Sequence, residues 1–482
     1  MKQRAYIPLF VAAALSLSIP TTAALAQEAV TFEDAISAFN YGDNDLANKH
    51  FWKLAGQGDA RAQYYLAYML DAGLGAGQDI NGAAGWYKKS AEQDFLPAVV
   101  YMGYIYSQGR GVAKDEKESF KWYTRAAQMG DAVAQNNLAT MLLVGRPYAK
   151  NAPLAAQWFL QSAMQGNMRA QYNLATMYRT GDGVKRNYPE AMRWYSFAAN
   201  QGDMYAQNAL GYMFRKNMGT ERPAPDATPE QKAALELANK QQAIEWYRRA
   251  AEQGHMKSQM ALALMYELGE AGADKSPDEA AVWYFSAAKQ GNEKAMHRLG
   301  YFYERGPEAC PAQGECAHPE REGRGLPKDD KEALKWYRKA AEEKNYTPSI
   351  IALARFYQNG MGGLRADGKK ALDLFMKAAN RKDPVAMLEL ARIYREGAGV
   401  PADKVRALQW YGLAFNALQD QSNDPKMPPP DADLQAEATR WRIFLRNNMT
   451  KNDIENATRM INSWRPTFVG NAPGDQPLFY DK

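Results

Sequence analysis

The hydrophobic positions of this chain recur with the period of an α-helix, and one pattern returns along most of its length. The segment "AMRWYSFAANQGDMYAQNALGYMF" (191–214) shows a single unit of that pattern. Its first apolar stripe, spaced at i, i+3, i+4, i+7 and i+8, consists of Ala191, Trp194, Tyr195, Ala198 and Ala199. This spacing places all five side chains on one face of a helix, so the segment predicts an amphipathic first helix.

A turn and a second helix follow in the same unit. Gly202 stands where a left-handed residue ends a helix, and Asp203 is suited to cap the next one. The second stripe consists of Ala206, Leu210, Met213 and Phe214. Each unit is therefore predicted to be an αα-hairpin. One hairpin cannot bury both of its stripes, so successive hairpins are expected to stack.

A pair of large apolar residues marks the first helix of each unit and returns about every 36 residues. The pairs are Phe51-Trp52, Trp86-Tyr87, Trp122-Tyr123, Trp158-Phe159, Trp194-Tyr195, Trp246-Tyr247, Trp283-Tyr284, Trp336-Tyr337, Leu374-Phe375 and Trp410-Tyr411. We expect both members of each pair to fill the space between successive hairpins. The predicted fold is all-α: an αα-hairpin repeat solenoid, a right-handed superhelix of about ten repeats with C-terminal capping helices.

The repeat resembles the Sel1-like repeat family, which is related to tetratricopeptide repeats and carries a GxGV turn between hairpins. That turn stands here as "GRGV" (109–112), "GDGV" (181–184) and "GAGV" (397–400). The resemblance covers about residues 32–415. The segment "NNMTKNDIENATRMINSWRP" (447–466) is similar to the closing helix of exported bacterial members, and Thr450 with Asp453 reads as its start. The resemblance implies an adaptor that binds other proteins.

Two insertions interrupt the period, near 219–240 and 306–330. In the first, Thr228, Pro229 and Gln231 match the cap and first turn of a helix that continues to Trp246. The second is a Pro- and Gly-rich loop. Insertions in solenoids often lie on a binding face, although surface elaboration without a function is the alternative.

The domain organisation follows from these features. We expect a signal peptide at 1–26, the solenoid at 27–417, a linker with capping helices at 418–466 and an irregular tail at 467–482. The linker includes the stiff "MPPP" stretch. For the tail, docking on the last helices, a loose conformation and insertion into a groove all stay open.

The N-terminus has the three parts of an export signal. Lys2 and Arg4 precede an apolar stretch at 7–17, and Ala24-Leu25-Ala26 forms a small-residue cleavage site. The mature chain is expected to begin at Gln27 and to be periplasmic or secreted. The alternative, a membrane anchor, is disfavoured because the apolar run is short and interrupted by Pro20. No later apolar run is long enough to span a bilayer.

The net charge restricts the class of partner, and the two cysteines have three possible states. Removing residues 1–26 removes two cations and no anion, which lowers the formal net charge from +5 to +3. Such a balance argues against nucleic acid or an anionic membrane as the partner. Cys310 and Cys316 lie in one loop, where a local disulfide is the simplest interpretation for an exported protein. Two free thiols, or a metal site with His318 that would lack a fourth ligand, are the alternatives.

No sequence pattern of catalysis or cofactor binding stands out. The four histidines are scattered over different units without metal-ligand spacing. The segment "GLRADGKK" (363–370) approaches a phosphate-binding loop, but Lys370 occupies the Ser/Thr position and the segment links two helices instead of following a strand. We therefore predict a protein that is not an enzyme, with no catalytic residues, metal or cofactor.

Three functions are considered for a chain with these features. The first is a periplasmic or secreted scaffold that binds a protein or peptide on the concave face, as exported family members do in envelope signalling or cell-surface polysaccharide production. The second is a peptidoglycan or glycan binder, suggested by the surplus of Tyr and Trp. The third is a β-lactamase-like hydrolase, discussed for cysteine-rich relatives that carry a Cys pair in every repeat. It is remote because this chain has one Cys pair in total, outside the repeat pattern.

Partner-binding residues are expected among second-helix aromatics that the repeat pattern does not require. They are Tyr68, Tyr104, Tyr172, Tyr212, Tyr301 and Phe356.

Overall fold

The structure is a computed structural model that describes residues 30–221, 223–270, 276–306, 326–425 and 427–466. Over these residues every regular element is a helix, and none of them is in a strand. The all-α prediction is therefore confirmed. The chain divides into two compact units, Met1–Asn167 and Met168–Lys482, and each unit is described by itself. Cys310, Cys316 and the expected tail lie outside the described residues.

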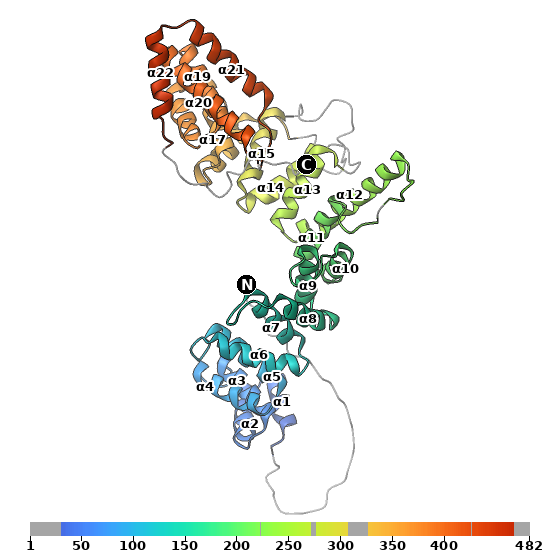
Figure 1. The fold of residues 1–482 in the computed structure, drawn as a ribbon. Helices are drawn as coiled ribbons and strands as arrows, with labels where there is room; N and C mark the ends of the chain where they lie inside the picture. Colours follow the sequence, from blue (N-terminus) through green and yellow to red (C-terminus); the bar gives the residue numbers. More distant parts are fainter. Residues whose placement is uncertain (1–29, 222, 271–275, 307–325, 426, 467–482) are drawn as a thin grey trace, which may run out of the picture. The chain divides into compact units, whose positions relative to one another are not determined.

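The described part of the first unit, from residue 30 on, contains eight helices. Figure 1 shows them at the blue end of the chain. They are α1 (Phe32–Asn40), α2 (Asn44–Gly56), α3 (Ala60–Ala72), α4 (Ile80–Glu92), α5 (Leu96–Gln108), α6 (Glu116–Gln128), α7 (Ala132–Val144) and α8 (Ala152–Met164).

The described part of the second unit continues the alternation of first and second helices. It contains α9 (Met168–Thr180), α10 (Tyr188–Asn200), α11 (Met204–Arg215), α12 (Pro229–Glu252), α13 (Met256–Leu268), α14 (Pro277–Lys289), α15 (Glu293–Arg305), α16 (Asp330–Arg338), α17 (Thr347–Asn359), α18 (Gly368–Ala379), α19 (Pro384–Glu396), α20 (Lys404–Asn423), α21 (Ala432–Asn447) and α22 (Lys451–Ser463). A short π-helical turn, Lys339–Glu343, continues α16.

The predicted turn residues lie where the pattern placed them. Gly202 has a φ of +98°, which closes α10, and the Asp203 side chain accepts a hydrogen bond from the backbone N–H of Ala206 to cap α11. The GxGV turns depend on glycine for space as well as conformation. A Cβ atom on Gly111 would lie 2.3 Å from the carbonyl oxygen of Ile80, so no other residue fits that turn without moving the backbone.

Hairpins stack in a regular way within each unit. A first helix packs on the second helix of its own hairpin, as α2 does on α3 and α10 on α11. Up to α19, each second helix then packs closely on the first helix of the next hairpin, as α3 does on α4 and α11 on α12. Second helices such as α3 and α11 are thus enclosed between two first helices of their unit, which buries both of their apolar sides.

The aromatic pairs divide into a buried and a half-exposed ring. The second member of each Trp/Leu–Tyr/Phe pair is at most 6% exposed; these rings, which we call knobs, are Tyr87, Tyr123, Phe159, Tyr195, Tyr247, Tyr284, Tyr337, Phe375 and Tyr411. Among the first members only Trp194, Trp336 and Trp410 are buried. The expectation that both members fill the space between hairpins is therefore wrong for most pairs.

The first pair, Phe51-Trp52, has the opposite order. Phe51 is fully buried and lies one period before Tyr87, whereas Trp52 is 45% exposed. Phe51 is therefore the knob of its hairpin, and Trp52 belongs to the outer surface, where its ring meets that of Trp86 at 5.5 Å.

Each knob after the first faces a small residue on the preceding second helix, which we call its seat. At three seats a Cβ atom would clash with a knob ring: 2.5 Å for Gly103 on Tyr123, 2.7 Å for Gly211 on Tyr247 and 2.6 Å for Gly300 on Tyr337. The same repeat position elsewhere holds the fully buried alanines Ala67, Ala139, Ala175, Ala263, Ala354 and Ala391. The seat and knob form the joint between hairpins.

Glutamines add a polar link at several joints, which the sequence analysis did not identify. The Gln63 amide donates to the Ala55 carbonyl at 3.2 Å and accepts from Gln93 at 2.8 Å, so it bridges α2, α3 and the end of α4. Equivalent Gln–Gln bonds of 2.7–2.9 Å join Gln165 to Gln135, Gln201 to Gln171, Gln253 to Gln207 and Gln290 to Gln259. The inner glutamines are buried, so these bonds satisfy groups that would otherwise lack partners.

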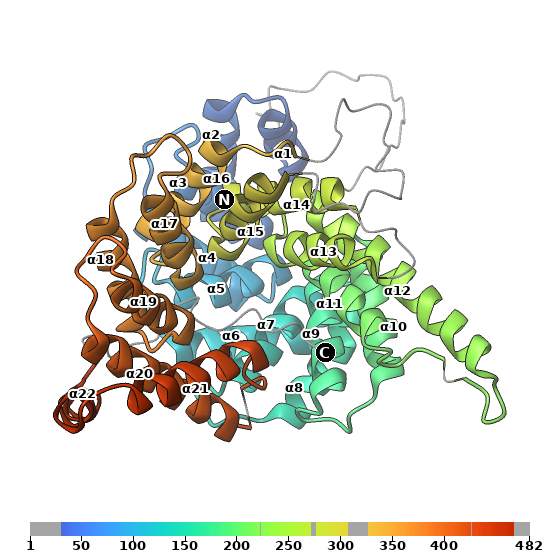
Figure 2. The same ribbon diagram turned by 90° about the horizontal axis from the view of Figure 1, so that it is seen from above.

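The insertion near 219–240 extends a helix as predicted. The Thr228 side chain accepts from the Gln231 backbone, and Gln231 returns a bond to the backbone of Thr228, which completes a capping box at the start of α12. The N-terminal half of α12 extends away from its neighbours (Figure 1, Figure 2). Of the second insertion, residues 307–325 lie outside the description.

The end of the array departs from one expectation. Helix α20 continues to Asn423, so residues 418–423 are helical and not linker. Asp431 caps α21, and the Thr450 side chain accepts from the Asp453 backbone to cap α22, which is the predicted closing helix. Helix α22 packs on α20.

The joint predicts a large effect for one added methyl group. Gly103→Ala would place its Cβ against the Tyr123 ring, and overpacking of this kind costs about 1–3 kcal/mol. The matched control is Gly85→Ala in α4, where a Cβ meets nothing within 4 Å. That substitution should stabilise the helix by about 0.5–1 kcal/mol. Urea unfolding midpoints of both variants check the pair; equal midpoints would contradict a tight joint.

Candidate interaction surface on the second helices

The residue directly after each seat lies on the side of the second helix that the next hairpin leaves open. We call these positions the second-helix row: Tyr68, Tyr104 and Thr140 in the first unit, and Thr176, Tyr212, Leu264, Tyr301, Arg355 and Arg392 in the second. None of them is buried. Four of the six predicted partner-binding residues, the tyrosines at 68, 104, 212 and 301, share this position, and Tyr212 is 39% exposed.

The other two predicted residues occupy different positions. Phe356 lies two residues after its seat, where the repeat holds core side chains, and it is 1% exposed with its ring 5.6 Å from that of Tyr337. The placement of Phe356 on a partner-binding surface is therefore corrected: the exposed position in that helix is Arg355. Tyr172 precedes its seat by one turn and packs on the knob Tyr195 with 5.5 Å between ring centroids. Its ring supports the joint.

The knob hydroxyls emerge on the same face and meet charged side chains. The partner is the residue four positions after the seat in each case: Tyr284 donates to Glu267 at 2.7 Å, Tyr337 donates to Glu304 at 2.7 Å, and Tyr411 accepts from Arg395 at 2.8 Å. Arg179 donates to Tyr195 at 3.3 Å. Where the knob is Phe159, which has no hydroxyl, the corresponding residue is Leu143.

Burial raises the pKa of two of these hydroxyls, those of Tyr411 and Tyr337. It raises the pKa of Tyr411 to about 12 and raises the pKa of Tyr337 further still, with the nearby Glu304 carboxylate adding to the effect. The Tyr337 hydroxyl therefore remains a hydrogen-bond donor at every physiological pH.

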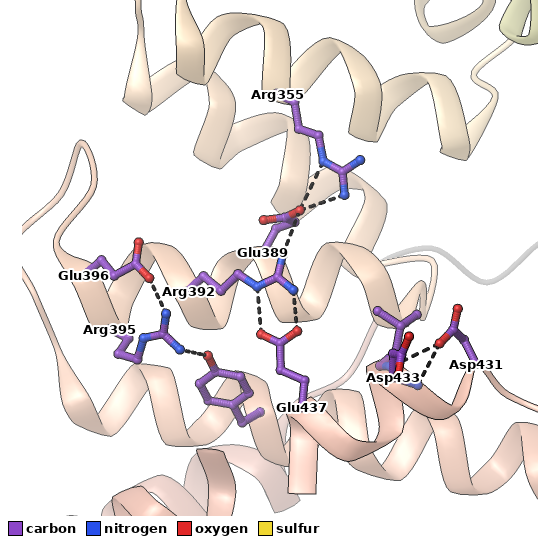
Figure 3. A network of polar contacts seen from close by, with 10 residues as sticks. Arg355, Glu389, Arg392, Arg395, Glu396, Asp431, Asp433 and Glu437 are labelled. Atoms are coloured by element: carbon purple, nitrogen blue, oxygen red, sulfur yellow. Dashed lines mark hydrogen bonds and ion pairs between the residues drawn. The ribbon is translucent and has the colours of Figure 1, made fainter. Parts of the chain in front are cut away.

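Ion pairs connect neighbouring second helices near the end of the second unit (Figure 3). Arg355 of α17 donates to Glu389 of α19 at 2.8 and 3.1 Å, and Arg392 lies 3.3 Å from the same carboxylate. Arg392 also donates through Nε, at 2.8 Å, and through Nη2 to the two oxygens of Glu437 on α21. The chain of charges therefore runs across α17, α19 and α21.

The ion pair between Arg392 and Glu437 favours the charged form of both side chains. The hydrogen bonds from Arg392 lower the pKa of Glu437 against the opposing effect of burial, and they raise the pKa of Arg392. The guanidinium of Arg395 lies 3.9 Å from the Trp441 ring centre and donates to the Tyr411 hydroxyl. Cation–π contact and ion pairing together hold α21 on α19.

Similar pairs occur along the same face elsewhere. Arg298 of α15 pairs with Glu267 of α13, and Arg215 of α11 pairs with Glu270 at 2.7 Å. In the first unit Asp71 accepts from Arg110 at 2.8 Å and from the Tyr101 hydroxyl at 2.9 Å. In each unit, the face formed by the second helices therefore carries paired charges next to tyrosines and arginines that are not buried.

Comparison with known proteins identifies the repeat. The Sel1 repeat profile matches residues 60–95, 96–131, 132–167, 169–203, 236–255, 257–292, 293–315, 311–345, 347–383 and 384–417. The chain therefore belongs to the Sel1 repeat family. The matched units begin with a second helix and run through the next first helix, which is the seat-and-knob pair. A comparison with curated proteins found no match.

A solved structure shares the fold. The chain is similar to a protective antigen present in uropathogenic Escherichia coli strains that displays an SLR fold, with 26% identity and a TM-score of 0.65 over 91% of this chain and 89% of that one. It is also similar to a Sel1 repeat protein from Oxalobacter formigenes, with 29% identity and a TM-score of 0.44 over 52% of this chain and 94% of that one.

The family's fold is typically that of a scaffold without catalytic activity, and it points to protein partners. Among the described residues, no group of three or more His, Cys, Asp or Glu side chains is arranged to hold a metal ion. No helix in the described part of the chain combines the length and apolar character needed to cross a membrane. Residues 363–367 belong to the link between α17 and α18, as expected for a turn between hairpins, and residues 368–370 begin α18.

The ion-pair network predicts a pH-dependent attachment of α21. Because the folded pKa of Glu437 is lowered, its stabilisation is complete above its unfolded pKa of about 4.3 and is lost as the pH falls through the folded value. Hydrogen-exchange protection of α21 should therefore decrease below about pH 4. Glu437→Gln should lower that protection by about 1.5–3 kcal/mol at neutral pH and flatten the pH dependence.

The control for this experiment is Glu396→Gln. Glu396 pairs with Arg395 through a side chain that is 56% exposed, so its loss should change protection little. If Glu396→Gln and Glu437→Gln have equal effects, the network does not hold α21.

Proposed function

We propose that this protein is an exported bacterial scaffold that binds a protein or peptide partner along the second-helix row. The fold supports the general statement, because Sel1 repeats form scaffolds with protein partners. The more specific proposal has one main support: this row places tyrosine and arginine at a repeat position that is neither seat nor knob and is not buried. In such solenoids the repeat geometry curves one surface into an extended concave binding face.

The composition of the row suits protein recognition. Tyr and Arg, with Trp, are the residues that contribute most to binding at protein interfaces. Tyr212 and Tyr301 occupy this position in two hairpins of the second unit, and Arg355 and Arg392 occupy it in later hairpins. The arginines are held in place by carboxylates of neighbouring helices, so they lose little conformational freedom on binding.

The surplus of aromatic residues gives less support to glycan binding. One ring of each aromatic pair is a buried knob, so the high Tyr and Phe content serves packing first. We therefore retain the protein-binding scaffold as the proposal.

The cellular setting is proposed from the N-terminal sequence and the family. Lys2, Arg4 and the Ala24-Leu25-Ala26 site support export with cleavage before Gln27, which would place the scaffold in the periplasm or outside the cell. Envelope signalling or cell-surface polysaccharide production would give such a scaffold a role.

Site-specific photocrosslinking in cells tests this proposal. A photoreactive amino acid at position 212 or 301 should yield the same crosslinked partner, recovered from the periplasmic fraction together with a mature chain that begins at Gln27. The matched control is position 197, because Phe197 is 45% exposed but lies on first helix α10. It should yield no crosslink to that partner.

A double variant measures how much these two tyrosines contribute to the affinity. Tyr212→Ala combined with Tyr301→Ala should weaken binding of the identified partner by at least about tenfold, since two interface tyrosines together contribute more than about 1.4 kcal/mol. Crosslinks that arise only from position 197, or a partner that binds the double variant as tightly as the unaltered chain, would refute the proposed face.

A further inference from the structure

The last hairpin, α20–α21, ends the array in a way that differs from every earlier described hairpin. In the earlier hairpins the second helix packs on a following first helix. Helix α21 is followed by α22, which instead packs on α20. In the part of the chain that the structure describes, no first helix therefore packs on the side of α21 that would meet a next repeat.

The repeat register assigns each residue of α21 to a known role. Seats lie eight residues after the cap of the second helix: Gly211 follows Asp203, and Ala391 follows Asp383. Counting from the cap Asp431 places the seat of α21 at Thr439. The glutamine that links hairpins lies four residues before the seat, and Gln435 occupies that position. Helix α21 therefore has the linking glutamine, and Thr439 stands at the seat position, where the earlier described second helices have glycine or alanine.

A depression in the surface marks the same place. It has a volume of about 440 Å³ and is lined by Phe415 and Gln419 of α20 and by Ala432, Gln435, Ala436, Thr439 and Arg440 of α21. The lining thus includes the seat Thr439 and the linking glutamine Gln435. Phe415 and Ala436 supply apolar walls.

The C-terminal half of α21, which follows the lining residues Thr439 and Arg440, is apolar and basic. Ile443, at the position that faces a knob tip in other hairpins, is 51% exposed, and Phe444 is 52% exposed. Terminal repeats of solenoids normally present a polar outer face, because exposed apolar surface there promotes association. Residues 439–446 contain three arginines and no acidic residue. An apolar, cationic surface at the end of a repeat array is suited to an acidic amphipathic partner.

We propose that this depression is a joint left open for a helix of another protein, with the pattern of a first helix of this fold. The partner helix carries an aromatic knob for Thr439, small residues one turn later, a glutamine six residues after the knob for Gln435, and acidic residues to meet Arg440 and Arg446. The other joints use the same chemistry within the chain, as Tyr284 and Gln290 of the α14 region do on α13.

That region supplies a probe for the experiment. A peptide with the sequence of residues 276–291 contains Asp278 and Glu279 in its first turn, the knob Tyr284 and the linking Gln290. Short helices are marginal in water, so the peptide is held helical by a side-chain crosslink between positions 282 and 286, and its helicity is measured by circular dichroism. The control peptide carries Tyr284→Ala.

Fluorescence anisotropy with the full chain should show saturable binding of the helical peptide at one site. Thr439→Trp, which fills the seat, and Arg440→Glu, which reverses a charge in the lining, should each weaken binding at least about tenfold, as should Tyr284→Ala in the peptide. The matched control is Thr458→Trp on the exposed surface of α22, which should bind as the unaltered chain does. Melting curves confirm that all variants remain folded.

Other occupants give different results. A second copy of this chain would appear as concentration-dependent self-association in sedimentation velocity that Thr439→Trp abolishes. An anionic lipid surface would appear as co-sedimentation with phosphatidylglycerol vesicles that the peptide does not compete with. Either result overturns the proposal, as does a helical peptide that fails to bind or that binds Thr439→Trp equally well.

The result is separate from the function proposed for the second-helix row. Tyr212→Ala with Tyr301→Ala should leave peptide binding at α21 unchanged, because neither residue lines the depression. If the peptide does not bind at α21, the proposed scaffold function is therefore unaffected. If the crosslinking at positions 212 and 301 fails, the proposal for α21 is likewise unaffected.

Discussion

The contact between a small seat and an aromatic knob organises this protein. A knob is buried because the preceding second helix presents glycine or alanine to it, and at Gly103, Gly211 and Gly300 even one methyl group would overlap the ring. The contact lies between hairpins and not within one, so a single hairpin has no stable core of its own. Stability and repeat-to-repeat geometry therefore depend on the same interaction.

The repeat separates positions that pack the core from positions that are open to a partner. Residues at the seat and in the core positions beside it are committed to packing, whereas the residue directly after the seat is open to solvent. The knob hydroxyls extend to that open face, where Glu267, Glu304 and Arg395 pair with them. These three joints thereby fix charged side chains on the surface next to them. A rigid row of tyrosines and arginines is a direct consequence of how the hairpins stack.

Much of the fold can be predicted from the sequence because the repeat is local and periodic. The burial of Tyr195, the left-handed Gly202 and the caps of α11, α12 and α22 all follow from spacing and residue type. The surface is harder to predict, because adjacent helical positions can differ completely in burial: Arg355 is exposed and Phe356 is buried. When the second helices are aligned on their seats, Tyr301 and Phe356 fall at different repeat positions. A glutamine that recurs four residues before the seat, as Gln63 does, is the sequence signal of the polar links. The pairing of Arg392 with Glu437 has no such signal, since it depends on how α21 packs beyond the last repeat.

The most direct test of this account is a double-mutant cycle at one joint, with Gly211→Ala on the seat and Tyr247→Leu on the knob. The added methyl group of the seat variant competes for space with the ring that the knob variant removes. The two losses in unfolding free energy should therefore be less than additive, with a coupling of about 1 kcal/mol or more. Strictly additive losses would show that seat and knob contribute independently, and would contradict the joint as the basis of the fold.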